Sequence, residues 1–164
     1  MSCAALALSA SLALADLYAG GPAAQAAAVQ AAGAQQVSPL ASEPLYADII
    51  SRARHLEGAV AGFRATAGLK DSPTAVRFVG FDAFKVSAAT LAELDMKGHF
   101  DLAARNTDGD LKCILKGISQ DIPEKLKALE AAKTGAEQDR ALDELAYLFN
   151  DNVGVITAPP KPPV

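Results

Sequence analysis

Asp95 and His99 are the side chains whose types and spacing come closest to metal chemistry in this sequence. They stand four residues apart in "ELDMKGHFD", so a continuous helix would place them on one face. Carboxylate and imidazole groups both bind zinc, but a zinc site takes four ligands, or three and an open position. The only other histidine, His55, belongs to a different predicted helix and would have to join from across a bundle. The three residues form an incomplete metal site, and the alternative is a surface histidine paired with a carboxylate.

The stretch from 122 to 145, "IPEKLKALEAAKTGAEQDRALDEL", is similar to the second hairpin of the small exported four-helix cytochromes. That resemblance implies a haem held without covalent bonds by a methionine and a histidine. Met96 with His55 or His99 would be the ligand pair here, because the last predicted helix has no histidine. The chain also lacks the C-x-x-C-H motif of covalently bound haem. We therefore expect no cofactor, and a metal or haem carrier is the alternative function.

Cys113 is the one cysteine that remains if the N-terminal segment is removed, because the other is Cys3. On a helix it falls roughly opposite the apolar stripe around it, and Lys112 and Lys116 favour its thiolate form. A thiol of this kind in an oxidising compartment predicts an intermolecular disulfide. The alternative is a cysteine packed against a neighbouring helix.

The segment "RNTDGDL" (105–111) has the oxygen ligands and the glycine with which a calcium-binding loop begins. In that register the first ligand position holds Ala104, and the last, which needs a bidentate glutamate, holds Leu115. Thr107 and Asp110 instead match the start of a helix, with Thr107 as the N-cap. We therefore predict a turn and a helix N-terminus here.

Composition and motifs point away from nucleic acid and from catalysis. The 164 residues carry a net charge of −4 and no basic run, whereas phosphate neutralisation needs a surplus of Lys and Arg. No nucleophile motif and no phosphate-binding glycine loop is present. We predict a non-enzymatic binding protein whose partner is another protein or a second copy of the chain.

The first 15 residues predict export to the periplasm or the outside of the cell. Their short apolar run ends in Ala13-Leu14-Ala15, which fits a signal-peptide cleavage site, although no positive charge precedes it. The alternative is an Ala-rich N-terminal helix. The run is too short for a membrane span, which takes about 20 residues. Residues 16–42 predict a flexible Ala/Gln-rich linker, and residues 157–164 an extended Pro-rich tail.

Residues 43–156 predict an all-α domain, an up-down-up-down antiparallel four-helix bundle. Apolar residues recur there at steps of three and four in four segments. The first segment begins at Ser42 as N-cap and ends near Gly68. The second opens at Ser72-Pro73, with bends near Gly80 and Gly98.

The third and fourth segments form an antiparallel hairpin because their link is short. An apolar stripe runs from Leu111 to Leu129, and Pro123 inside it predicts a kink or a restart capped by Asp121. Thr134 and Glu137 form the capping box that opens the last helix.

Overall fold

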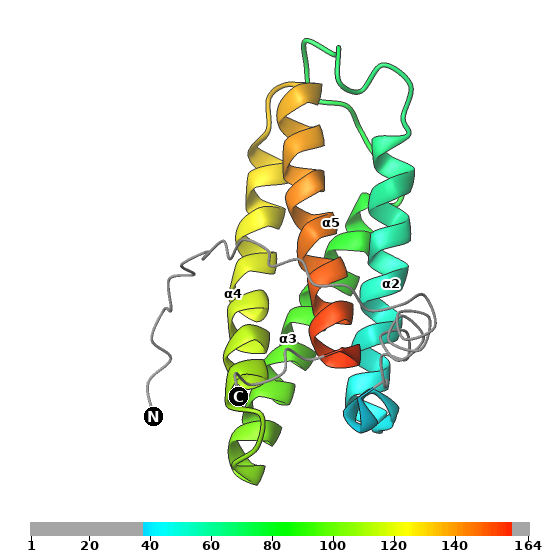
Figure 1. Cartoon of the computed structure of the whole chain (residues 1–164). Helices are drawn as coiled ribbons and strands as arrows, with labels where there is room; N and C mark the ends of the chain where they lie inside the picture. The colour runs from blue at the N-terminus through cyan, green and yellow to red at the C-terminus, as the bar shows by residue number, and fades with distance from the viewer. Residues whose placement is uncertain (1–37, 159–164) are drawn as a thin grey trace, which may run out of the picture. The chain divides into compact units, whose positions relative to one another are not determined.

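The computed structural model describes residues 38–158, which form four long helices, one short 3-10 helix and no strand (Figure 1). The elements are η1 (Pro39–Ser42), α2 (Pro44–Arg64), α3 (Phe81–Arg105), α4 (Gly109–Ala131) and α5 (Gly135–Thr157). The four long helices pack against one another, which confirms the all-α class. The predicted signal peptide 1–15, most of the 16–42 linker and the tail beyond 158 lie outside the described residues. No helix of the described part combines the length and apolarity of a membrane span.

Each long helix has two close neighbours. The helix α3 packs against α4 and α2, and α5 packs against α2 and α4. The helices α3 and α5 therefore lie at diagonally opposite corners of the bundle. At one end of it, the Ser38 N–H donates to the Thr157 carbonyl at 2.9 Å and joins the start of η1 to the end of α5.

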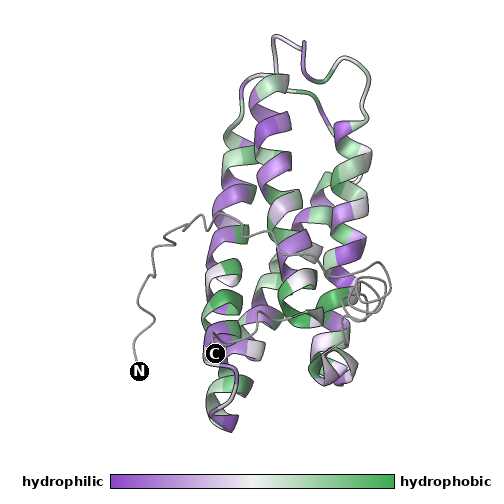
Figure 2. Ribbon diagram, viewed as in Figure 1, coloured by the Kyte–Doolittle hydropathy of each residue, from purple (hydrophilic) through white to green (hydrophobic). Residues whose placement is uncertain are grey.

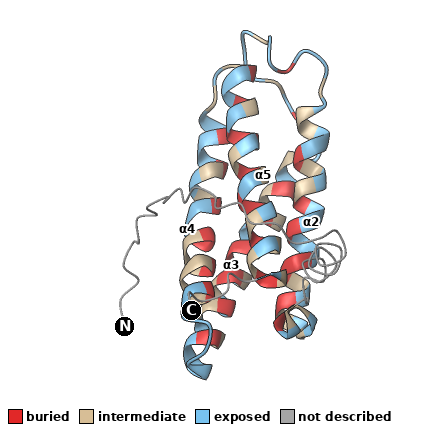
Figure 3. Ribbon diagram, viewed as in Figure 1, coloured by how far each residue is buried: buried red, intermediate tan, exposed pale blue. Residues whose placement is uncertain are grey.

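The core is built from the inward faces of these helices. Hydrophobic and hydrophilic residues alternate around each helix (Figure 2), and the buried ones lie on the sides turned toward the other helices (Figure 3). The predicted stripe on α4 is confirmed, because all six of its members are buried. They are Leu111, Leu115, Ile118, Ile122, Leu126 and Leu129.

The prediction that the second helix opens at Ser72-Pro73 is wrong, because α3 begins only at Phe81. Residues 65–80 form a long loop instead. The apolar steps at Val76 and Val79 resemble a helical face, yet Val79 is 95% exposed. Gly80, in the left-handed conformation with φ of 79°, is the N-cap of α3.

The predicted cap at Thr107 is also wrong, because α4 begins at Gly109 and its N-cap is Asp108. The backbone N–H of Thr107 donates to the Leu102 carbonyl, and that of Asn106 to Ala103. This pair of bonds is a Schellman-type closure of α3, with Asn106 left-handed. Thr107 therefore serves the end of α3, although the prediction of a turn at this segment holds.

Two further local predictions differ from the structure. Ser42 is not the N-cap of α2, because its hydroxyl donates to the Pro39 carbonyl and Glu43 takes that position. The helix α4 continues through Pro123 without a restart at Asp121. The bend near Gly98 remains a prediction; this residue lies inside α3, where a Cβ atom would stand 3.0 Å from Leu115 Cδ1. The glycine at 98 thus permits close helix packing.

The predicted capping box of the last helix is confirmed. The Thr134 hydroxyl accepts from the Glu137 N–H at 3.3 Å, and the Glu137 carboxylate accepts from the Thr134 N–H at 3.2 Å. Both bonds satisfy donors that the first turn of a helix leaves open. The start of α5 is therefore well defined, and the long α2–α3 loop packs on it.

Candidate functional site

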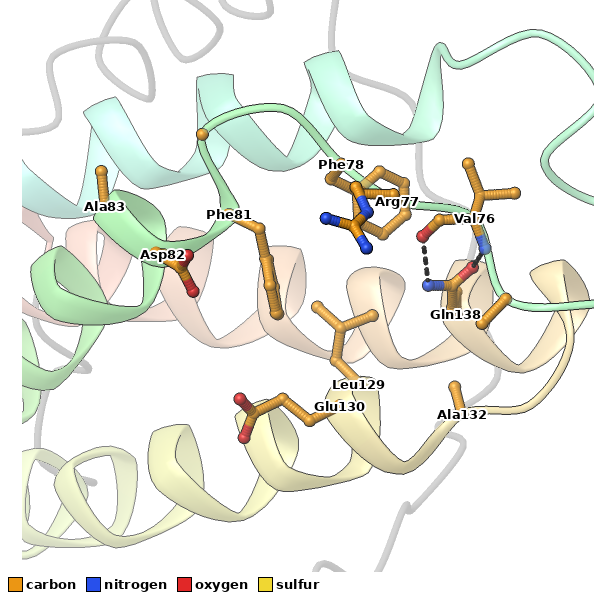
Figure 4. Close-up of a pocket in the computed structure, with 12 residues that line it drawn as sticks. Val76, Arg77, Phe78, Phe81, Asp82, Ala83, Leu129, Glu130, Ala132 and Gln138 are labelled. Carbon is orange, nitrogen blue, oxygen red and sulfur yellow. Dashed lines mark hydrogen bonds between the residues drawn. The ribbon is translucent and has the colours of Figure 1, made fainter.

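A groove of about 470 Å³ lies between the α2–α3 loop, the start of α3 and the end of α4 (Figure 4). Figure 4 shows Phe81 and Leu129 on facing sides of it, and Gln138 bonded to Val76 at one end. Ordered loops of this length without secondary structure are uncommon in compact domains and are often functional. The groove is therefore the candidate site of the described residues.

Gln138 holds the loop segment that forms the upper wall of this groove. Its side-chain oxygen accepts from the Val76 N–H at 2.7 Å, and its side-chain nitrogen donates to the Val76 carbonyl at 2.9 Å. Gln138 is itself buried. One amide side chain thus satisfies both backbone groups of Val76, as a neighbouring strand would, and keeps residues 75–78 extended.

A second attachment fixes the loop nearer to α2. The Gly135 N–H donates to the Ser72 carbonyl at 3.0 Å, and Leu69 is buried beside it. Any Cβ atom at position 135 would overlap the Leu69 carbonyl oxygen. The loop backbone can approach α5 this closely only because position 135 has no side chain.

An aromatic cluster packs beside the groove, and two of its members, Phe78 and Phe81, line it. Its members are Phe63, Phe78, Phe81, Phe84 and Phe149, which are five of the six phenylalanines in the chain. The rings of Phe63 and Phe78 lie 4.9 Å apart, and those of Phe63 and Phe84 lie edge to face at 5.2 Å. Such pairs add to the burial energy of the rings. Phe78 therefore anchors the loop by its own side chain.

Of the two cations near the mouth of the groove, Lys85 is paired with carboxylates and Arg77 is not, within residues 38–158. Lys85 contacts Glu130 at 2.8 Å and Asp82 at 3.2 Å, and both contacts raise the pKa of Lys85. The same ammonium lies 5.3 Å from the centre of the Phe81 ring. Arg77 lines the groove as well, and its guanidinium has no ion pair within residues 38–158. The groove thus combines aromatic side chains with a cation that has no ion pair in the described part of the chain.

In the structure, Asp95 and His99, two of the residues predicted as metal ligands, have different partners. Asp95 is fully buried and accepts from the Asn152 side chain of α5. His99 Nδ1 lies 2.7 Å from the Lys112 carbonyl oxygen, and His55 is exposed on α2. No group of three or more His, Cys, Asp or Glu side chains that suits a metal occurs among the described residues.

The other predicted sites are placed as follows. Met96 is partly buried on α3, and Cys113 is partly buried on α4. The intermolecular disulfide at Cys113 remains a prediction. In the former calcium-loop candidate, Leu115 is fully buried in the core and is not available as a ligand.

The groove residues were missed from the sequence because their spacing matched a helix. Val76 and Val79 are three residues apart, and so are Phe81 and Phe84, which is a spacing that a helical face also shows. The signals that did mark a loop were Gly68, Ser72-Pro73 and Gly80. No sequence pattern indicates that Gln138, more than 60 positions later, bonds to Val76.

Comparison with protein-family models, with curated proteins and with solved structures gave no match. The site is therefore interpreted from its own residues.

Proposed function

We propose that this protein acts by non-covalent binding of another protein, without catalysis, and that the groove beneath the α2–α3 loop is its binding site. The observation that carries the proposal is Arg77, which lines an aromatic groove and has no ion pair among residues 38–158. Binding sites of proteins typically pair apolar walls with a few polar groups that fix orientation. Arginine and aromatic residues are also enriched at the energetic centres of interfaces.

The chemistry of the groove suggests what it accepts. A large apolar side chain would contact Phe81 and Leu129, and an adjacent carboxylate would pair with Arg77. Lys85 contacts both Glu130 and Asp82, and its one positive charge offsets part of the repulsion that these two carboxylates exert on an acidic group. The expected partner is a protein segment with an acidic residue next to a large apolar one.

Site-specific photo-crosslinking tests this proposal. A photoreactive phenylalanine analogue replaces Ala75, an exposed residue that lines the groove, and a matched variant carries it at Lys127, an exposed residue of α4 outside the groove. Irradiation in cells that make the protein is expected to give a discrete adduct from position 75 only. Phe81→Ala should reduce that adduct. Equal yields from both positions would show that the groove is not the binding site.

Export, the up-down-up-down topology and the absence of catalysis belong to the same proposal. The apolar residues 1–15 support export. The short links between α3 and α4 and between α4 and α5 support the antiparallel order. The mass of the mature protein tests export, and loss of the first 15 residues is the expected result.

A further inference from the structure

Asp95 and Asn152 form a polar contact inside the core, between diagonally opposite helices. Both residues are 0% exposed. The Asn152 Nδ2 donates to both carboxyl oxygens of Asp95, at 2.9 and 2.8 Å. The Asn152 Oδ1 is buried and has no hydrogen-bond partner in the described part of the chain. Unsatisfied buried acceptors are rare in folded proteins.

This geometry is the one that an ionised Asp95 requires. An ionised carboxylate has only acceptors, so it attracts the amide NH2 group and repels the amide oxygen. Asn152 must then turn its NH2 group between the two carboxyl oxygens and leave its own oxygen unbonded. A protonated carboxyl has one O–H donor. The acid and the amide can then exchange two hydrogen bonds, one from Nδ2 to Asp95 and one from the Asp95 O–H to Asn152 Oδ1.

We infer that the Asp95–Asn152 contact is a proton-dependent latch between α3 and α5. The bundle is most stable when Asp95 is protonated and loses stability when Asp95 is ionised, because a charge buried here costs more than the two contacts with the Asn152 amide return. The latch lies outside the groove of the proposed function and does not depend on it. The latch responds to the pH of the compartment in which the protein works.

Burial is what makes the latch respond near neutral pH. Desolvation raises the pKa of Asp95 from 3.8 to about 7, and the hydrogen bond from Asn152 opposes that rise. No charged side chain of the described residues contributes. The titratable and charged groups on the surrounding turns are bonded elsewhere or partly exposed: Tyr46, Asp48 and Arg52 on α2, Glu93, Lys97, His99 and Asp101 on α3, Lys112 and Lys116 on α4, and Asp151 on α5.

The direction of the pH effect follows from linkage. The folded protein keeps the Asp95 proton between pH 3.8 and about 7, whereas the unfolded chain has lost it. The contribution to stability is therefore complete below the unfolded pKa and is lost as pH rises through the folded pKa. One proton separates the states in this range, so the unfolding equilibrium constant rises by up to about tenfold per pH unit.

Urea unfolding of the full chain between about pH 5 and about pH 9 tests the latch. The urea midpoint of the wild type is expected to fall as pH rises. Asp95→Asn keeps the shape and cannot ionise, so that fall should be much smaller. Asp151→Asn is the matched control, because Asp151 is an adjacent, partly buried acid whose pKa is also raised by burial. Its variant should keep most of the wild-type slope.

A second measurement needs no variant. The chemical shift of the Asp95 carboxyl carbon, followed by NMR against pH, should titrate near 7. Titration at the ordinary aspartate pKa, or an Asp95→Asn slope equal to that of the wild type, would overturn the inference. If Asp95→Asn does not fold, the NMR titration alone decides.

Discussion

Gly135, the first residue of α5, lies so close to the Leu69 carbonyl oxygen that no side chain fits between them. The contact joins the α2–α3 loop to the start of the last helix. Gly135→Ala should therefore displace the loop or the helix start and lower the free energy of unfolding by about 1–3 kcal/mol. The measurement is urea denaturation followed by circular dichroism. Gly117→Ala on α4, where nothing lies within 4 Å of the added carbon, should instead stabilise by about 0.5–1 kcal/mol.

Thr134 is the N-cap of α5, whereas Thr107 matches a capping sequence but is not the N-cap of α4. Thr134→Ala removes the hydroxyl that accepts from Glu137, and it should cost about 1 kcal/mol of stability. Thr107→Ala, on an exposed side chain that caps no helix, should leave the urea midpoint nearly unchanged. An equal loss in both variants would show that Thr107 caps α4 after all.

Gln138 holds in place the α2–α3 loop, which forms one side of the groove. Gln138→Ala removes both side-chain bonds to Val76. Because the Val76 N–H then loses its acceptor, its hydrogen exchange should accelerate strongly, and stability should fall by about 1–3 kcal/mol. Gln120→Ala, at an exposed position of α4, is the control and should change neither. If hydrogen exchange at the Val76 N–H is unchanged in Gln138→Ala, Gln138 does not hold the loop in place.

Asn152→Ala should be more harmful at high pH than at low pH. The amide hydrogen bond lowers the pKa of Asp95, so its removal should raise that pKa further. An ionised Asp95 then loses its only donor, at a cost of about 1–3 kcal/mol, whereas the protonated acid loses less. Asn150→Ala, on an exposed position of the same helix, should show no such pH dependence. Urea midpoints at two pH values on either side of 7 measure the difference.

A loss of stability is also expected on the acid side. The backbone N–H groups of Lys133 and Thr134 lower the pKa of Glu137 below its usual value of 4.5. The stability that this carboxylate contributes is present above 4.5 and is lost as pH falls through its folded pKa. Glu137→Gln should flatten that part of the pH profile and leave the part between pH 5 and 8 unchanged. If Glu137→Gln leaves the loss of stability at low pH unchanged, other carboxylates cause that loss.

Much of the architecture was predictable because it depends on local periodicity. The α4 stripe from Leu111 to Leu129 was read correctly, since six apolar residues at helical spacing have one efficient way to be buried. The capping box at Thr134 was equally clear, because both of its bonds lie within four residues. The helical class and the approximate positions of α2, α4 and α5 follow from patterns of this kind.

The sequence by itself therefore determined the helical class, the buried stripe and the last capping box. The tertiary structure decided where α3 begins and what surrounds Asp95. Val76 is extended because Gln138, from a distant part of the chain, satisfies its backbone. Asp95 looked like half of a metal site beside His99, but the fold buries it against Asn152 of α5. Both outcomes depend on partners more than 50 positions away, and a contact at that separation leaves no trace in local spacing.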